Sequence, residues 1–279
     1  MKWLILRRFS QLSILGLFIF APVGIIKGNL SSSVLFNTIP LTDPYVLLQS
    51  FFAGHSLAKT ALIGAMIVLI FYFIVGGRVY CSWVCPINII TDAAGWLRNR
   101  LGIKNTSSFS RQTRYWILAM SLIIGLFSGT LAWELVNPVS MFQRGLIFGG
   151  VAMWFIVLAI FFFDLLVIKN GWCGHLCPVG AFYSLINKIS LIRVKATRRN
   201  ACDDCLDCFI VCPEHQVIKL PLKGAAKGSN PLILAANCTN CGRCIDVCNK
   251  QVFEYSHRFS HKLSQLETHP QQTIHRQEK

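Results

Sequence analysis

The stretch that decides the fold is residues 202–213, which read CDDCLDCFIVCP, together with residues 238–249, which read CTNCGRCIDVCN. Each holds four cysteines spaced Cys-x2-Cys-x2-Cys-x3-Cys, a spacing that binds [4Fe–4S] clusters. In tandem runs of this kind, the first three thiolates bind one cluster and the fourth reaches the other. We therefore expect one cluster on Cys202, Cys205, Cys208 and Cys248, and a second on Cys238, Cys241, Cys244 and Cys212.

Zinc ribbons and disulfides are the alternatives for closely spaced cysteines. Structural zinc sites use one or two Cys-x2-4-Cys pairs rather than two runs of four. The C-terminal part, residues 169–279, is also polar and carries more than half of the Lys and Arg residues. The spacing therefore favours a ferredoxin-type part that transfers electrons, and the composition indicates that this part is polar.

The N-terminal part is strongly apolar. Of the 279 residues, 53% are hydrophobic and only 14% are charged, whereas soluble domains carry about 25% charged residues. Four segments approach the about 20 apolar residues that span a bilayer. They are roughly residues 10–26, 60–77, 115–133 and 145–168. The sequence therefore predicts an integral membrane α-helical domain with four transmembrane helices.

The basic residues suggest how such a domain would be oriented. They gather at the N-terminus, between the second and third segments, and in the C-terminal part. The positive-inside rule places these regions in the cytoplasm, a reducing compartment where free thiols persist. The predicted location is the bacterial inner membrane, multi-pass, with both termini cytoplasmic. The first segment lacks the small-x-small site of a cleaved signal peptide. The net charge is +15, but the sequence has no basic stripe with interleaved aromatic residues of the kind that binds nucleic acid. Nucleic acid is therefore not an expected partner.

The remaining four cysteines form a second, repeated motif. Residues 81–86 read CSWVCP and residues 173–178 read CGHLCP, and Asp43-Pro44 upstream of the first matches Asn137-Pro138 upstream of the second. Two such copies resemble a parallel internal repeat of a two-helix hairpin. The sequence therefore predicts that four motif cysteines meet at the inner face, namely Cys81, Cys85, Cys173 and Cys177.

Three roles are open for these four thiols. They could bind zinc, copper or iron, or cycle between dithiol and disulfide beside a quinol. They could also be small buried residues at helix ends, since free cysteine often behaves as a small hydrophobe. The doubling of the motif favours a function, and the choice between metal binding and thiol redox chemistry stays open.

Single polar residues near the ends of the apolar segments are candidates for contact with a quinol. A quinol loses two protons with its two electrons, so an acid or a histidine near its headgroup would be useful. The candidates are Asp164, Glu134, His55, Asp43 and Arg144. The competing interpretation is structural, because Asp164 could simply pair with Lys169 and the others could lie at an interface.

The combination of four apolar segments, a doubled Cys-x3-Cys-Pro motif and a C-terminal two-cluster run resembles the NapH family, the membrane ferredoxin-type subunits of periplasmic nitrate reductase systems. The resemblance covers residues 1–255 and includes all twelve cysteines. It implies a quinol dehydrogenase subunit that uses the quinol pool. Electrons would pass through a periplasmic ferredoxin-type partner, NapG, and a c-type cytochrome to the nitrate reductase. Asn249 follows Cys248 where Pro213 follows Cys212, a departure that leaves the thiolates intact.

The predicted architecture has three parts. Residues 1–190 form the four-helix membrane domain with its internal two-hairpin repeat and both Cys-x3-Cys-Pro motifs. Residues 191–255 form an α+β bacterial two-[4Fe–4S] ferredoxin-like domain, and residues 256–279 form a polar tail that we expect to be mobile. The expected cofactors are two [4Fe–4S] clusters, with quinol as substrate. The alternative function is non-catalytic maturation, anchoring or redox sensing that uses the Cys-x3-Cys-Pro thiols.

Overall fold

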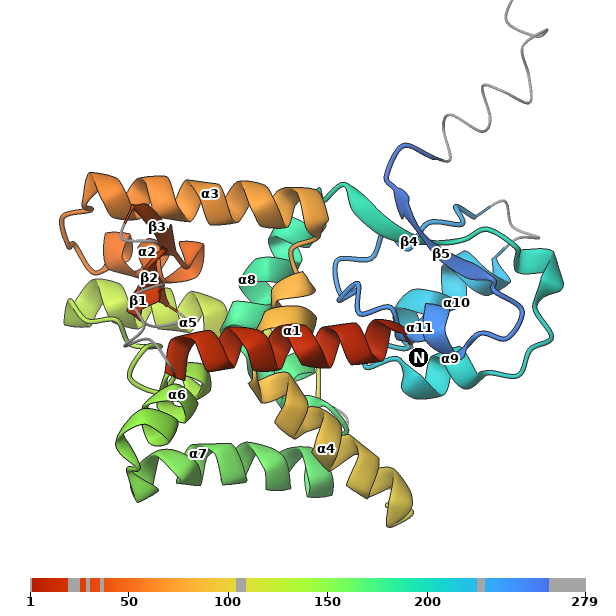
Figure 1. Ribbon diagram of the computed structural model, residues 1–279, viewed down its shortest axis with the longest axis horizontal. Helices are drawn as coiled ribbons and strands as arrows, with labels where there is room; N and C mark the ends of the chain where they lie inside the picture. Colours follow the sequence, from red (N-terminus) through yellow and green to blue (C-terminus); the bar gives the residue numbers. More distant parts are fainter. Residues whose placement is uncertain are drawn as a thin grey trace, which may run out of the picture.

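The computed structural model describes residues 2–19, 26–28, 31–35, 38–103, 109–224 and 229–260. Figure 1 shows a larger, mainly helical part on the left and a smaller cysteine-rich part on the right. Most of the predicted polar tail, residues 261–279, lies outside the described residues.

The helical part contains the helices α1 (Lys2–Ile19), α2 (Pro44–Phe52), α3 (Lys59–Val75), α4 (Ile87–Arg100), α5 (Thr113–Ser128), α6 (Pro138–Phe148), α7 (Val151–Phe162) and α8 (Pro178–Asn187). It also contains the π-helical turns η2 (Tyr80–Val84), η3 (Phe163–Val167) and η4 (Trp172–Leu176), and the strands β1 (Ile26–Gly28), β2 (Ser32–Leu35) and β3 (Ile39–Thr42). The cysteine-rich part contains β4 (Ile192–Ala196), the 3-10 turn η5 (Arg199–Ala201), α9 (Asp207–Val211), α10 (Gln216–Lys223), α11 (Arg243–Val247) and β5 (Phe253–His257).

A small antiparallel sheet closes one end of the helical part. Strand β2 lies between β1 and β3, with Ser33 opposite both Gly28 and Leu41. Helix α3 crosses this sheet so closely that a Cβ on Gly64 would lie 2.9 Å from the carbonyl oxygen of Pro40. The absence of a side chain at Gly64 therefore permits the contact between α3 and β3.

The helical part contains one structural unit twice. The first unit runs α2, α3, η2 and α4, and the second runs α6, α7, η4 and α8, with η3 joining α7 to the turn before η4. Both units begin with a side chain that caps a helix whose first residue is proline, which is a favoured start because proline lacks the N–H that would be unpaired there. Asp43 accepts a hydrogen bond from the N–H of Tyr45, and Asn137 accepts one from the N–H of Val139.

The prediction of four transmembrane helices is wrong. Among the helices that the structure describes, none is both long enough and apolar enough to cross a bilayer. Helix α1 has 18 residues but includes Lys2, Arg7 and Arg8. Helix α3 has 17 residues, which at about 1.5 Å per residue gives about 26 Å, against about 30 Å of hydrocarbon.

Glycines stop the other two predicted spans. Helix α5 ends at Ser128, because Gly129 adopts a left-handed conformation with φ of 63°. Gly149, with φ of 67°, ends α6, and α7 then restarts at Val151 and has only 12 residues. Apolar runs of spanning length therefore fold as shorter helices. An average of hydropathy over the sequence does not detect these breaks, because it ignores the backbone conformation. Some of their large apolar side chains remain exposed, including Phe71 on α3 and Phe127 on α5.

Several arginines used in the topology argument are internal. Arg7, Arg78, Arg98 and Arg114 are each at most 2% exposed. Arg98, for example, donates a hydrogen bond of 2.8 Å to the carbonyl oxygen of Leu165. A buried guanidinium needs such partners, because leaving its donors without acceptors costs free energy. These charges are therefore part of the packed interior.

The cysteine-rich part is closed by the pairing of its first and last strands. Strands β4 and β5 are antiparallel, with Ile192 opposite His257 and Ala196 opposite Phe253. Buried side chains from these strands and α10 form its core, which includes Val194, Ile218 and Phe253. Strand β5 thus extends two residues beyond the predicted boundary at residue 255.

The beginning of α1 joins the two parts. Asp246, on α11, accepts hydrogen bonds from the backbone N–H groups of Trp3 and Leu4, at 3.2 and 2.9 Å. A carboxylate stabilises the N-terminus of a helix, where N–H groups lack acceptors and the helix dipole is positive. Figure 1 shows the resulting contact, with α1 extending from the helical part to α11.

A test of the packing between the two units uses Gly77, which precedes η2. A Cβ at this position would lie 2.1 Å from the carbonyl oxygen of Tyr183 and 2.6 Å from the backbone nitrogen of Asn187, both on α8. We expect Gly77→Ala to lower the free energy of unfolding by about 1–3 kcal/mol or more, as overpacking does. Chemical denaturation of the anaerobically purified protein, followed by circular dichroism, would measure this change.

Gly16→Ala is the matched control for Gly77→Ala. Gly16 lies inside α1, and a Cβ at this position would meet no described heavy atom within 4 Å. Alanine is favoured over glycine in a helix by about 1 kcal/mol, so this variant should be as stable as the parent or more stable. Equal stability of the two alanine variants would contradict the close contact at Gly77.

Candidate functional site

The two ferredoxin-type loops, residues 202–208 and 238–244, follow the same backbone path. In the first loop, Asp204 and Leu206 have φ angles of 56° and 64°. Asn240 and Gly242 hold the equivalent places in the second loop, with φ angles of 47° and 74°. Left-handed residues at alternate positions curl a loop and turn its N–H groups inward, as happens at many iron–sulfur sites. Leucine avoids this conformation, so tertiary contacts must hold Leu206 in it.

Each four-cysteine run, residues 202–212 or 238–248, contributes cysteines to both of two cavities in the cysteine-rich part. The cavity that we call ferredoxin cavity 1 is lined by Cys202, Cys205, Cys208 and Cys248. The second, ferredoxin cavity 2, is lined by Cys212, Cys238, Cys241 and Cys244. Each set therefore takes three thiols from one four-cysteine run and the fourth from the end of the other run. Binding of one cluster by each set stays a prediction.

The four cysteines of the Cys-x3-Cys-Pro motifs line a third cavity, the motif cavity. The N–H of Cys85 donates to the carbonyl oxygen of Tyr80, and the N–H of Cys177 donates to that of Trp172, each at 2.9 Å. These bonds close the π-helical turns η2 and η4, a geometry that is common at functional sites. Both motifs thus present their thiols from the same kind of widened turn. All four cysteines are free of disulfide bonds.

Large apolar side chains complete the wall of the motif cavity. Trp133 and Trp172 are stacked, with ring centroids 6.4 Å apart, and both line the cavity together with Tyr80, Ile87 and Val179. Burial raises the pKa of the Cys177 thiol to about 12, and the neighbouring thiol of Cys81 contributes to this rise. This environment favours neutral thiols over free thiolates.

A fourth cavity, the arginine cavity, lies between the motif cavity and ferredoxin cavity 2. It is lined by Cys81 and Cys173, which also line the motif cavity, and by Cys241, which also lines ferredoxin cavity 2. Arg7, Arg78 and Arg243 line it as well. The Ser82 hydroxyl, next to Cys81, donates a hydrogen bond of 2.8 Å to the carbonyl oxygen of Thr239. These three cysteines of the two sets are therefore neighbours across a small space whose charged lining residues are three arginines and Glu214.

Arg78 connects all four cysteine motifs. It precedes the first Cys-x3-Cys-Pro motif and donates to the carbonyl oxygen of Cys173, which begins the second, at 3.2 Å. It also donates to the Glu214 carboxylate, just after Cys212, at 3.0 Å, and to the carbonyl oxygen of Asn237, just before Cys238, at 2.7 Å. Burial tends to raise the pKa of Glu214, but the charge of Arg78 and the hydrogen bonds to the carboxylate keep that pKa below its ordinary value.

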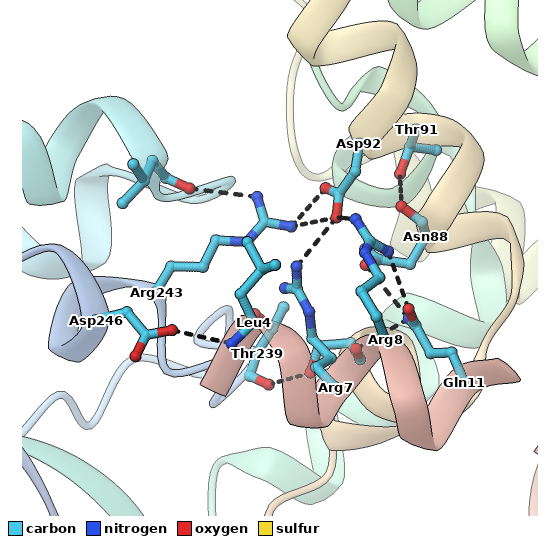
Figure 2. A network of polar contacts seen from close by, with 12 residues as sticks. Leu4, Arg7, Arg8, Gln11, Asn88, Thr91, Asp92, Thr239, Arg243 and Asp246 are labelled. Atoms are coloured by element: carbon cyan, nitrogen blue, oxygen red, sulfur yellow. Dashed lines mark hydrogen bonds and ion pairs between the residues drawn. The ribbon is translucent and has the colours of Figure 1, made fainter. Parts of the chain in front are cut away.

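Asp92 forms the centre of a second ion-pair network, which Figure 2 shows. Its carboxylate, on α4, accepts hydrogen bonds from Arg7 and Arg8 of α1 and from Arg243 of α11. One acidic side chain thus ties together three helices from both parts of the molecule. It also partly neutralises two of the arginines that line the arginine cavity.

These charged residues are the part of the site that sequence reasoning missed. No sequence motif of their own marks these residues, which are Arg78, Asp92, Glu214 and Arg243. The available signal was proximity, since Arg78, Glu214 and Arg243 stand within three residues of motif cysteines. Asp92 had no such signal, because only the tertiary structure brings it to Arg243.

The candidate quinol contacts fall into different environments. Asp164 is buried and Asp43 is half-buried, whereas His55 and Arg144 are exposed. Asp164 accepts a hydrogen bond of 2.9 Å from the N–H of Trp172, and burial raises the pKa of Asp164 to about 7. Its expected pairing with Lys169 is absent among the hydrogen bonds described, since the Lys169 ammonium donates to the carbonyl oxygen of Ile210.

Asp43 lies among tyrosines that lead to the motif cavity. The Tyr183 hydroxyl donates to its carboxylate at 3.0 Å. The ring of Tyr183 stacks on that of Tyr80, with centroids 4.9 Å apart, and Tyr80 lines the motif cavity. Burial raises the pKa of Asp43 to about 6, the hydrogen bonds from Tyr45 and Tyr183 lower it, and the nearby Glu134 raises it. Asp43 is therefore a half-buried carboxylate suited to exchange a proton near neutral pH.

Removing the charge of Asp92 tests the ion-pair network. The side chain of Asp92 is 9% exposed and that of Arg7 is 1% exposed. Asp92→Asn should lower the free energy of unfolding by about 3 kcal/mol or more, because breaking a buried pair leaves uncompensated charge. Chemical denaturation of the holoprotein would measure the loss.

Asp204→Asn provides the control for Asp92→Asn. Asp204 pairs with Lys223 at 3.1 Å, but its side chain is 67% exposed, and exposed pairs contribute only about 0–1 kcal/mol. Asparagine also tolerates the positive φ at this position. If Asp92→Asn lowered the free energy of unfolding no more than Asp204→Asn does, the ion-pair network would not contribute to stability.

Comparisons with known proteins match two iron–sulfur families to the segments that contain the cysteines. Residues 57–104 and 146–199 match the family described as "4Fe-4S binding domain", and residues 201–252 match the family described as "4Fe-4S dicluster domain". The first pair of segments contains the Cys-x3-Cys-Pro motifs, and the second match contains the ferredoxin-type loops. No solved structure matches the chain.

Full-length relatives identify the family. The chain is 49% identical to the ferredoxin-type protein NapH of Haemophilus influenzae over 93% of this chain and 91% of the relative. It is 45% identical to NapH of Escherichia coli, with the same coverage of both chains. It is also 51% identical to the methylamine utilization ferredoxin-type protein MauN of Paracoccus denitrificans, over 92% of this chain and 91% of the relative. The chain therefore belongs to the NapH-type family of iron–sulfur electron-transfer proteins.

Proposed function

We propose that this chain oxidises a quinol and delivers the electrons toward a periplasmic nitrate reductase. The observation that carries the proposal is the continuous series of contacts from Asp43 through Tyr183 and Tyr80 to the motif cysteines, and on through the arginine cavity to Cys241. One end of this series can accept a proton, and the other end lies at a predicted cluster site. Quinol oxidation needs both capacities, because it releases two protons and two electrons.

The proton-accepting end is Asp43. Its carboxylate accepts hydrogen bonds from the N–H of Tyr45 and the hydroxyl of Tyr183, and the charge of Glu134 acts on it as well. A base must be deprotonated to act, and a pKa of about 6 leaves Asp43 mainly ionised at pH 7. Asp43 therefore acts as the first acceptor of a quinol proton.

The electron-accepting end consists of the cysteine sets and the arginines beside them. Bound [4Fe–4S] clusters would supply one-electron redox chemistry, and their reduction potentials depend on net charge and hydrogen bonds around the sulfurs. Cys212, Cys238, Cys241 and Cys244 hold the position nearest to the arginine cavity. Arg7, Arg78 and Arg243 outnumber the two carboxylates that pair with them, Asp92 and Glu214, and the remaining positive charge favours the reduced, more negative state.

The similarity to NapH supports the proposed downstream partners. A periplasmic ferredoxin-type subunit like NapG would accept the electrons, and a c-type cytochrome would pass them to the nitrate reductase. The similarity to MauN supports a second candidate acceptor system, that of methylamine utilization. Deletion of the gene should stop nitrate-dependent respiration if the first assignment holds, and growth on methylamine if the second holds.

Quinol-dependent reduction of the clusters tests the proposed function directly. The anaerobically purified, oxidised protein should develop electron paramagnetic resonance signals of reduced clusters when mixed with a reduced quinone analogue such as menadiol. Dithionite, which reduces accessible clusters without a quinol site, is the positive control. Signals that appear with dithionite and never with quinols would reject quinol oxidation and favour a maturation or sensing role.

Asp43→Asn tests the role of the proton acceptor. Asparagine is as good a helix cap as aspartate, so α2 should still begin normally. In the parent, the rate of quinol-dependent reduction should rise as the pH passes through about 6, because deprotonation of Asp43 creates the base. The variant should be roughly tenfold or more slower and should lack this rise, since general bases contribute about 10²–10⁴-fold.

Glu254→Gln is the carboxylate-to-amide control for Asp43→Asn. Glu254 is exposed on β5 in the cysteine-rich part. In stopped-flow measurements of cluster bleaching, the Glu254→Gln variant should show the same rate of quinol-dependent reduction and the same pH profile as the parent. An unchanged rise near pH 6 in Asp43→Asn would assign the proton transfer to another group.

A further inference from the structure

We propose that the arginine cavity binds a chloride ion, held by the guanidinium groups of Arg7 and Arg243 next to Cys241. The matched families account for iron–sulfur binding and assign no anion to the chain. The proposal goes beyond the proposed function, because it concerns what the protein binds whether or not quinol is its electron source.

The first observation is a group of N–H donors without acceptors on two arginines that line the cavity. Arg7 is only 1% exposed and bonds to Asp92 through Nη2, but its Nε and Nη1 have no partner among the described residues. The Nε of Arg243 has none either, although its Nη nitrogens bond to Asp92 and to the carbonyl oxygen of Val211. Figure 2 shows the bonds that both arginines make with Asp92. A buried donor without an acceptor is costly, and more so when it is charged. The cavity therefore favours an occupant that accepts hydrogen bonds.

The second observation is the charge of the lining. Among the described residues, three arginines and one carboxylate line the cavity, and that carboxylate, Glu214, already pairs with Arg78 at 3.0 Å. Asp92 pairs with Arg7 and Arg243 without lining the cavity. Three arginines thus face two carboxylates. A water molecule could accept the same hydrogen bonds, but the excess of positive charge favours an anion.

The third observation is the size of the cavity, which is about 20 Å³. One water molecule needs about 10–15 Å³ of such space, so the cavity admits a single small occupant. Anions of several atoms, such as nitrate, sulfate or phosphate, are too large for it. Among anions, the size therefore limits the occupant to a monatomic ion such as chloride, with a water molecule as the alternative.

The sulfur of Cys241 is the other acceptor that the surroundings could supply. Cys241 lines the cavity, and a thiolate there would attract the Arg7 guanidinium. Its sulfur nevertheless makes no hydrogen bond with the Nε or Nη1 of Arg7. Attraction between charges at a distance does not replace a hydrogen bond, which requires an acceptor in close and aligned contact with the donor. The unpaired donors of Arg7 therefore need an acceptor of their own.

The place of the ion links its binding to the redox state of the protein. Cys241 is one of the four cysteines of ferredoxin cavity 2, where the second cluster is expected. An electron that arrives there adds negative charge, which repels a neighbouring anion. The oxidised protein should therefore bind chloride more tightly than the reduced protein, with one chloride released as one electron is taken up. The guanidinium groups of Arg7 and Arg243 are then free to stabilise the added charge.

Equilibrium dialysis of the oxidised holoprotein against chlorine-36 chloride tests the assignment directly. We expect binding to saturate at about one chloride per chain, because the cavity holds one small occupant. Bromide should displace the ion, whereas the larger sulfate should not. A parent protein that binds no chloride would overturn the proposal and leave water as the occupant. No quinol is used, so a failure here is separate from a failure of the proposed function.

Two matched variants locate the ion. Arg7→Met removes donors that line the cavity, so chloride binding should be lost. Arg8→Met removes the same charge from the same helix, and Arg8 also bonds to Asp92, but Arg8 does not line the cavity. This control should still bind about one chloride per chain. Equal chloride binding by the two variants would exclude Arg7 as a ligand and overturn the assignment.

A redox titration of the parent locates the ion even if Arg7→Met does not fold. Dithionite reduces the holoprotein in chloride solutions of constant ionic strength, with gluconate, which is too large for the cavity, as the replacing anion. Raising chloride tenfold should lower the midpoint potential of the iron–sulfur electron paramagnetic resonance signal by up to about 59 mV, since one ion leaves for each electron. A midpoint potential that does not depend on chloride would contradict an ion next to Cys241.

Discussion

The buried guanidinium of Arg78 is the interaction on which the rest of the structure depends. It stands just before one Cys-x3-Cys-Pro motif and bonds to the first residue of the other, and it also reaches the residues beside Cys212 and Cys238. The planar, multi-donor shape of arginine allows such a junction, which the single ammonium of lysine could not form. Because one side chain bonds at all these places, the helical and cysteine-rich parts are held in a fixed relation.

Charge explains why this junction is built from arginines. Burying a cation is costly unless acceptors and opposite charge surround it. Glu214 pairs with Arg78 and Asp92 pairs with Arg243, and the cysteines would supply more negative charge when they bind clusters as thiolates. The burial of arginines therefore matches a site that becomes strongly negative once it is loaded. The same arrangement lets Cys81, Cys173 and Cys241 approach one another without strong repulsion.

Different parts of the molecule were predictable to different degrees. The two Cys-x3-Cys-Pro motifs, separated by a whole structural unit, could be matched from sequence because the helix caps Asp43 and Asn137 repeat with them. The transmembrane prediction failed because hydropathy sums side chains and ignores the backbone. Gly129 and Gly149 turn the chain into left-handed conformations and end helices within apolar runs. Asp92 could not be found, because its partners Arg8 and Arg243 are distant in sequence.

The sequence by itself determined the chemistry and the family. Spacing between cysteines is a local property, so the residues 202–213 and 238–249 indicate iron–sulfur binding before any fold is known. Only the tertiary structure decided that Cys81, Cys173 and Cys241 line a common cavity, and that arginines line it with them. The physical reason is that these contacts join segments far apart along the chain. They form only when burial of apolar surface and pairing of internal charges bring those segments together.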